Sequence, residues 1–94
     1  MKYIVWTIDK QENEYTITEN VRATAKWNTI IKKCALAMLE ELTAAGIGTG
    51  NARLTTDPPN VWTNGAIGGA WIEIDGHSYP LDIVRQDGCV EARA

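Results

Sequence analysis

The chain has few of the side chains from which catalytic and metal sites are built. It carries one histidine, His77, and two cysteines, Cys34 and Cys89, with no paired spacing. Structural zinc sites need about four such ligands at short spacings, and covalent catalysis needs a base beside its nucleophile. Cys34 falls on the apolar side of a predicted helix, where burial disfavours the reactive thiolate. We therefore expect no enzymatic activity, no bound metal ion and no cofactor.

The sequence also lacks an excess of positive charge and any long apolar run. Its formal net charge is −3, whereas nonspecific nucleic-acid binders normally present a basic surface. No run approaches the ~18 apolar residues of a membrane-spanning helix. The first apolar run is interrupted at Thr7 and Asp9, too early for a signal-peptide core. We expect a cytoplasmic protein whose partner is neither a membrane nor a nucleic acid.

Cysteine is too scarce here for a secreted disulfide scaffold, which in a chain of this size would carry more of it. The sequence leaves a Cys34–Cys89 bridge open. Apolar residues make up 45% and charged residues 22% of the 94 residues, which is the usual range for a globular domain. We expect a single α+β domain over residues 1–94, with residues 90–94 frayed.

One long amphipathic helix is predicted between Thr24 and Gly46. Thr24 suits the N-cap because its hydroxyl can accept an early backbone N–H, and Gly46 suits the position after the C-cap, where a left-handed conformation favours glycine. Apolar side chains recur at three- and four-residue steps, the spacing of one buried stripe. This stripe comprises Trp27, Ile30, Ile31, Cys34, Ala35, Met38, Leu42 and Ala45. Leu36 projects to the opposite side of the helix.

Strands are predicted on both sides of the helix. Residues 2–8 and 15–18 are rich in β-branched and aromatic side chains and are separated by a polar turn. Ile4, Trp6 and Ile8 are expected to share the covered face of the first strand, so Trp6, like Trp27 of the helix, is assigned to the core.

The segment after the helix is predicted to contain two hairpins. Residues 53–56 favour a short strand that residues 57–60 interrupt, because prolines cannot donate to a ladder. Asn64-Gly65 signals a hairpin turn, and Gly68-Gly69 loosens the chain after it. In the last hairpin Asp75-Gly76 predicts a type I′ turn. That turn pairs Ile74 with His77, Ile72 with Tyr79 and Ala70 with Leu81, so that these residues and Ile83 form one apolar face.

The predicted element order is β-β-α-β-β, with a further strand if the chain returns after residue 87. One helix then packs on a mostly antiparallel sheet of four or five strands. This topology resembles the β-grasp arrangement of ubiquitin-like and immunoglobulin-binding domains, and the resemblance covers most of the chain without any diagnostic motif. A plain helix-on-meander sheet is the alternative.

Surface tryptophans and acidic neighbours favour a protein-binding function. Tryptophan is enriched at binding hot spots. Trp71, Glu73 and Asp82 are predicted to share the outer face of the last hairpin, while Trp62 and Leu36 are two further contact candidates. We expect a small intracellular protein-binding module, an inhibitor or adaptor that blocks a larger complex. Compact proteins of this type are common on phages and other mobile elements.

Other functions remain as alternatives. A glycine-rich loop at 46–50 beside Trp62 could form a pocket for a nucleotide or another small ligand, including at a homo-oligomer interface. A structural subunit could add an exposed sheet edge to a neighbour's sheet. Catalysis would have to involve His77, but strand alternation sends Ser78 to the opposite face, so no nucleophile–base set is assembled.

Overall fold

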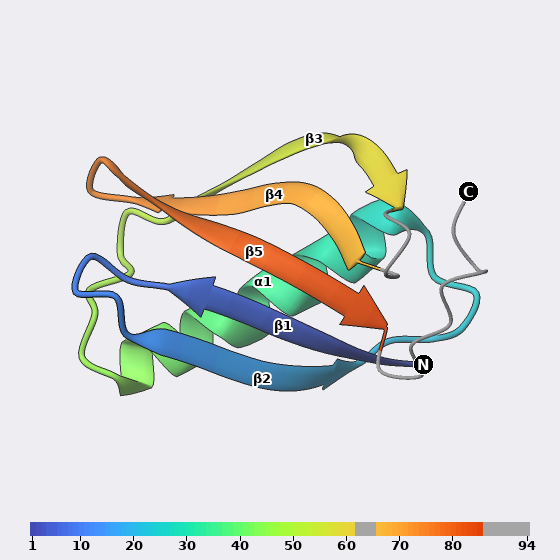
Figure 1. Ribbon diagram of the computed structural model, residues 1–94, viewed down its shortest axis with the longest axis horizontal. Helices are drawn as coiled ribbons and strands as arrows, with labels where there is room; N and C mark the ends of the chain where they lie inside the picture. Colours follow the sequence, from blue (N-terminus) through green and yellow to red (C-terminus); the bar gives the residue numbers. More distant parts are fainter. Residues whose placement is uncertain (62–65, 86–94) are drawn as a thin grey trace.

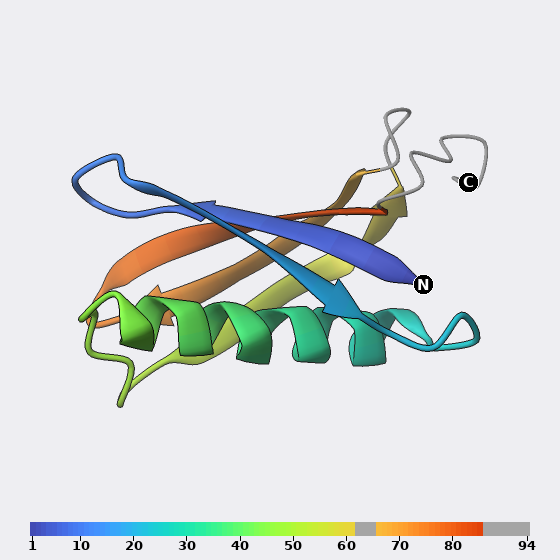
Figure 2. The same ribbon diagram turned by 90° about the horizontal axis from the view of Figure 1, so that it is seen from below.

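The computed structural model describes residues 1–61 and 66–85 of the chain. A single helix lies across one face of a five-stranded sheet whose strand order is β2-β1-β5-β4-β3 (Figures 1 and 2). The elements, in chain order, are β1 (Lys2–Ile8), β2 (Glu14–Asn20), α1 (Trp27–Ala44), β3 (Arg53–Val61), β4 (Ala66–Ile74) and β5 (His77–Arg85). The α+β class and the predicted element order are therefore confirmed.

All neighbouring strands in the described sheet pair antiparallel. β1 and β5 lie side by side at the centre, and β3, β4 and β5 form a meander that ends against β1. The sequence leaves two arrangements open, a β-grasp sheet and a plain helix-on-meander sheet. The second of these describes the observed strand pairing. The chain passes from one edge of the sheet to the other through α1, which connects β2 to β3.

The helix is shorter at its N-terminus than predicted. It begins at Trp27, and Lys26 is the N-cap residue, without a side-chain hydrogen bond to the helix. Thr24 lies in a turn before it, so the N-cap prediction is wrong. The preceding turn has its own backbone hydrogen bond, from Ala25 N–H to the Arg22 carbonyl at 3.0 Å. This local bond holds Thr24 outside the helix.

The C-terminal end of the helix has a Schellman motif. Gly46 adopts φ +91°, and its N–H donates to the Thr43 carbonyl at 3.0 Å. The Ile47 N–H donates to the Leu42 carbonyl at 3.0 Å, which satisfies a second carbonyl of the last turn. The partly buried Ile47 packs against the core, as does Leu42. The role predicted for Gly46 is confirmed.

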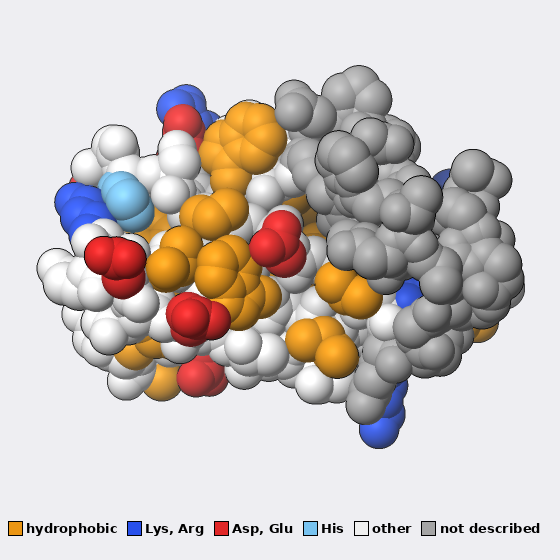
Figure 3. Space-filling view, viewed as in Figure 1, with side chains coloured by type: hydrophobic (Ala, Val, Ile, Leu, Met, Phe, Trp, Pro, Cys, Tyr) orange, Lys and Arg blue, Asp and Glu red, His pale blue; other side chains and the backbone are white. Residues whose placement is uncertain are grey.

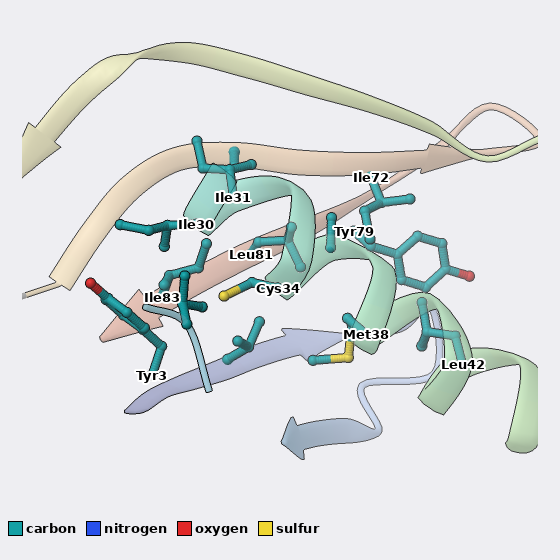
Figure 4. Packing of buried hydrophobic residues seen from close by; sticks show 14 of the residues in the cluster. Tyr3, Ile30, Ile31, Cys34, Met38, Leu42, Ile72, Tyr79, Leu81 and Ile83 are labelled. Atoms are coloured by element: carbon teal, nitrogen blue, oxygen red, sulfur yellow. The ribbon is translucent and has the colours of Figure 1, made fainter. Parts of the chain in front are cut away.

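The core lies between α1 and the sheet (Figure 4). Of the predicted helix stripe, Ala45 is exposed and the Trp27 side chain lies outside what the structure describes. The remaining stripe residues are buried, namely Ile30, Ile31, Cys34, Ala35, Met38 and Leu42. They face buried side chains of the three central strands, which are Tyr3, Val5, Ala70, Ile72, Ile74, Tyr79, Leu81 and Ile83.

The faces of β1 are opposite to the prediction. Tyr3, Val5 and Thr7 are buried toward the helix, whereas the Trp6 side chain is only partly buried on the other face, with its strand neighbours Ile4 and Ile8. The assignment of Trp6 to the core is therefore wrong. Alternation along a strand sends successive side chains to opposite faces, and both sets in β1 are largely apolar. The pairing with β2 decides which of the two sets is buried, because directly paired residues of neighbouring strands lie on the same face of the sheet.

The strands after the helix are longer than predicted. β3 continues through Pro58 and Pro59, with a register shift between Thr56 and Asn60. An edge strand tolerates proline because one side of it has no ladder to complete. β4 likewise continues through Gly68 and Gly69, with a shift between Ile67 and Ala70. The Asn64-Gly65 turn lies outside the described residues.

The last hairpin, β4–β5, has the predicted register. Ile74 pairs with His77, Ile72 with Tyr79 and Ala70 with Leu81. Asp75 and Gly76 have φ values of +49° and +81°, the positive values that a type I′ turn requires at both central positions. The alternation of the hairpin then places its even-numbered β5 residues on the face opposite α1.

Candidate binding surface

The sheet face opposite α1 carries a partly exposed apolar patch with carboxylates around it. We call this surface the open face. Its apolar members are Ile4, Trp6, Ile8, Trp71, Pro80 and Val84, and its carboxylates are Glu14, Glu73 and Asp82. In the space-filling view, hydrophobic side chains gather over the middle of this face and acidic side chains lie among and beside them (Figure 3). The patch results from the alternation of side chains along each strand. Every second side chain points into the core, and the side chains between them point to the open face.

Trp6 and Asp82 are cross-strand partners at the centre of the open face. Directly opposed residues have Cβ atoms about 4.5–5.5 Å apart, close enough for their side chains to act together. The Trp6 Nε1–H donates to Glu14 Oε1 at 2.9 Å, which fixes the orientation of the indole. Asp82 is exposed and makes no ion pair or hydrogen bond with the residues that the structure describes. An oriented aromatic ring therefore stands beside a carboxylate that has no ion-pair or hydrogen-bond partner among the described residues.

Trp71 forms the second aromatic element of the open face. It pairs with Pro80 of β5 on one side and with Thr55 of β3 on the other. One register step away, Glu73 pairs with Arg53, and the Arg53 Nη2 atom lies 3.0 Å from Glu73 Oε1. The Arg53 side chain is 79% exposed, so this ion pair adds little stability. It does set a positive charge at the β3 border of the open face.

The predicted contact residues divide between places in the molecule. Trp71, Glu73 and Asp82 lie on the open face together, as their alternation predicts. Leu36 is 63% exposed on α1, away from the sheet, and is therefore not part of this surface. Trp62 lies outside the described residues. The structure adds Trp6, for which the sequence predicts a position in the core.

A signal for Trp6 was present in β2. Tyr15 and Ile17 alternate with Thr16 and Thr18, which marks the odd-numbered residues as the covered set. The hairpin pairs Tyr15 with Thr7 and Ile17 with Val5. Directly paired residues lie on the same face of a sheet, so the polarity of β2 assigns Trp6 to the other face.

Two hollows have linings that include none of the open-face aromatic residues. The larger, about 640 Å³ and open to solvent, is lined by Asn51, Ala52, Arg53, Glu73, Asp75 and Gly76. Its charged residues are two carboxylates and Arg53, which is already paired with Glu73. The smaller, about 200 Å³, lies between α1 and β3 and is lined by Asn28, Ile31, Lys32, Leu54 and Thr56. The larger hollow lacks the apolar lining of a usual small-molecule site, and the smaller one is below the roughly 300–1,000 Å³ that such sites have.

The described titratable groups that have shifted pKa values serve the fold. Burial and, to a lesser extent, the charge of Glu19 raise the pKa of the Cys34 thiol to about 12, which makes it unreactive. His77 makes an edge-on ring contact with Tyr79, with centroids 4.7 Å apart.

Within the part of the chain that the structure describes, no group of three or more His, Cys, Asp or Glu side chains could hold a metal ion. No helix there has the length and apolar character needed to cross a membrane.

Asp9 is buried in the β1–β2 connection and accepts four hydrogen bonds. The donors are the backbone N–H groups of Gln11 at 2.9 Å and Asn13 at 2.8 Å, the Asn13 amide at 3.1 Å, and the Tyr15 hydroxyl at 2.8 Å. Burial raises the pKa of the Asp9 carboxyl, but these hydrogen bonds, led by the Asn13 backbone, outweigh burial and lower it. Asp9 therefore organises the hairpin loop.

Comparison with protein-family models, with curated proteins and with solved structures found no match for this chain.

Proposed function

We propose that this protein is a small protein-binding module and that the open face is its contact surface. The observation that carries the proposal is the apolar patch around Trp6 and Trp71, which is partly exposed and bordered by carboxylates. Aromatic anchors at the centre of a patch with a polar rim are the usual composition of a binding hot spot. Trp6 on β1 and Trp71 on β4 each stand on a strand that pairs with β5, so the backbone of the surface is ordered before binding.

The charges of the open face indicate the chemistry of the partner. Asp82 and Trp6 stand opposite each other, and together they suit a lysine or arginine side chain. The cation would lie over the indole ring and beside the carboxylate. The apolar residues Ile8, Pro80 and Trp71 suit an apolar side chain next to that cation. We therefore propose a partner protein that presents an apolar centre with basic residues around it.

Binding without turnover is the property of an inhibitor or adaptor, and we extend the proposal to that role. The mild negative charge of −3 supports a basic protein surface as the target. The net charge does not support a nucleic acid as the target, because the open-face carboxylates would repel its phosphates. The charged lining of the larger hollow disfavours nucleotide phosphates in the same way.

The first experiment is an affinity capture that compares wild type, Trp71→Ala and Leu36→Ala. Leu36 is the matched control because it is an exposed apolar residue on the other side of the molecule. We expect one protein to be retained by wild type and by Leu36→Ala but lost with Trp71→Ala. A protein retained equally by all three baits, each shown to be folded, would contradict the open face as the contact surface.

The captured protein is then purified and titrated. We expect Trp71→Ala and Trp6→Ala each to weaken binding by about 30-fold or more, the range of hot-spot truncations. Asp82→Asn should weaken it by about fivefold at low salt, with a smaller effect at high salt because the attraction is screened. An Asp82→Asn effect that is absent at every salt concentration would exclude a cationic group at this position.

A further inference from the structure

The outer edge of β2 is a regular strand edge without a partner in the described sheet. β2 is the terminal strand of the sheet. Its seven residues pair with β1 in one unbroken register, from Lys2↔Asn20 to Ile8↔Glu14. A strand edge of this kind exposes a row of backbone donors and acceptors to any strand that approaches it.

The backbone groups on this edge can be identified from the ladder. At its two ends the Asp9 N–H donates to the Asn13 carbonyl at 3.0 Å and the Val21 N–H donates to the Met1 carbonyl at 2.9 Å. Hydrogen-bonded pairs alternate along an antiparallel ladder, so the odd-numbered residues of β2 bond to β1. The even-numbered residues direct their N–H and C=O groups outward, and these are Glu14, Thr16, Thr18 and Asn20.

The opposite edge of the sheet is protected where β2 is not. β3 contains Pro58 and Pro59, which have no N–H to offer, and its register shifts between Thr56 and Asn60. Proline and register irregularities are among the devices by which proteins prevent pairing at an edge. β2 has neither device, and its centre, Thr16 to Thr18, is β-branched throughout.

We propose that β2 pairs antiparallel with β2 of a second copy of this chain, about a two-fold axis at Ile17. In this register Thr16 stands opposite Thr18 of the other copy. The outward N–H and C=O groups of one strand can then form hydrogen bonds with those of the other strand. Ile17 meets its own copy, and Tyr15 meets Glu19. Glu14 meets Asn20, so no carboxylate faces another along the pairing. The strand is thus self-complementary, as a two-fold interface requires.

This proposal is independent of the open face as a partner site. The dimer uses the backbone edge of β2, and the two sheets become continuous with both open faces still accessible on the same side. Loss of partner binding and loss of dimerisation are therefore separate outcomes. Trp71→Ala serves as the control here, because it should leave the dimer unchanged.

The register is tested by charge substitutions at Asn20, measured by sedimentation equilibrium. Asn20→Lys places a lysine opposite Glu14 of the other copy and should tighten the dimer about threefold to tenfold, because each contact occurs twice. Asn20→Glu should weaken it by a similar factor. Within one copy Asn20 pairs with Lys2, so the same substitutions should shift fold stability in the reverse direction. Equal effects of both charges, or weakening by Trp71→Ala, would overturn the proposal.

Amide hydrogen exchange tests the edge directly. We expect the Thr16 and Thr18 amides to become protected as protein concentration rises, while Tyr15 and Ile17 are protected at all concentrations. A protein that is monomeric throughout the concentration range overturns the proposal. A dimer in which Thr16 and Thr18 exchange as fast as in the monomer overturns it as well.

Discussion

At the scale of single residues, the most unusual feature is a side-chain hydroxyl group that is buried in the core. Thr7 is fully buried on β1, and its Oγ1 has no hydrogen-bond partner within the described structure. A buried polar group without a partner loses its hydration and gains nothing in exchange. The position therefore holds a residue that is unfavourable for stability.

We predict that Thr7→Val raises the free energy of unfolding by about 1 kcal/mol. Valine keeps the shape of the side chain, suits a strand and replaces the unsatisfied hydroxyl with a methyl group. Urea unfolding of both proteins provides the measurement. Thr16→Val, at an exposed β2 position, should change stability by less than about 0.5 kcal/mol. A loss of stability in Thr7→Val would show that the hydroxyl has a role in the fold.

Asp9 gives the fold an acid-sensitive point. Its folded pKa lies below the ordinary value of 3.8 because hydrogen bonds to the carboxylate outweigh burial. A carboxyl group whose pKa is lower in the folded state than in the unfolded state stabilises the native state at pH values above the unfolded-state pKa. This stabilisation is lost as the pH falls through the folded-state pKa.

We therefore expect wild type to lose stability below about pH 4 more steeply than Asp9→Asn does. Urea midpoints between pH 6 and pH 2 measure the difference, which should shrink as the pH falls. Tyr15→Phe removes one donor to Asp9 and should give a smaller change in the same direction. A difference between wild type and Asp9→Asn that is constant over this range would contradict the assignment.

At the scale of elements, the end of the helix depends on one backbone conformation. Gly46 has φ +91°, and a Cβ added there would meet no atom within 4 Å. The cost of a larger residue at this position is therefore conformational and not steric.

We predict that Gly46→Ala lowers the free energy of unfolding by about 1 kcal/mol, because alanine disfavours the left-handed region. Gly48→Ala is the matched control, since Gly48 also has open space around it but no positive φ. Thermal or urea unfolding of the two variants measures the contrast. Equal effects at both positions would mean that the Schellman motif does not hold the helix end.

At the scale of the whole molecule, the core is closed around Cys34. Its side chain is fully buried between α1 and the sheet, and its thiol pKa is raised to about 12 (Figure 4). A thiol reagent reaches such a group only when the helix separates from the sheet, which requires a large opening of the fold.

We predict that Cys34 in a Cys89→Ser background reacts with a thiol reagent at least about a thousandfold more slowly than an unfolded thiol. The reaction rate should rise with urea in parallel with global unfolding. Rapid labelling in native buffer would show that the helix detaches from the sheet in a local motion. The variant itself is compared with wild type by urea unfolding, which checks that its stability is unchanged.

The sequence by itself determined the features that depend on neighbouring residues. The β4–β5 hairpin followed from Asp75-Gly76 and the alternation on either side, and the end of the helix followed from Gly46. These are local effects of allowed φ values and of side-chain periodicity. For the same reason Trp71, Glu73 and Asp82 could be placed on one face.

Only the tertiary structure decided the features that depend on distant pairing. Both faces of β1 are apolar enough for the core, and its register against β2 put Thr7 inside and Trp6 outside. β3 could run through its prolines because it became an edge strand. Trp6 and Asp82 met because the first and last strands pair at the centre of the sheet. Each of these outcomes depends on which strands become neighbours, and residues far apart in the chain settle that together when the core closes.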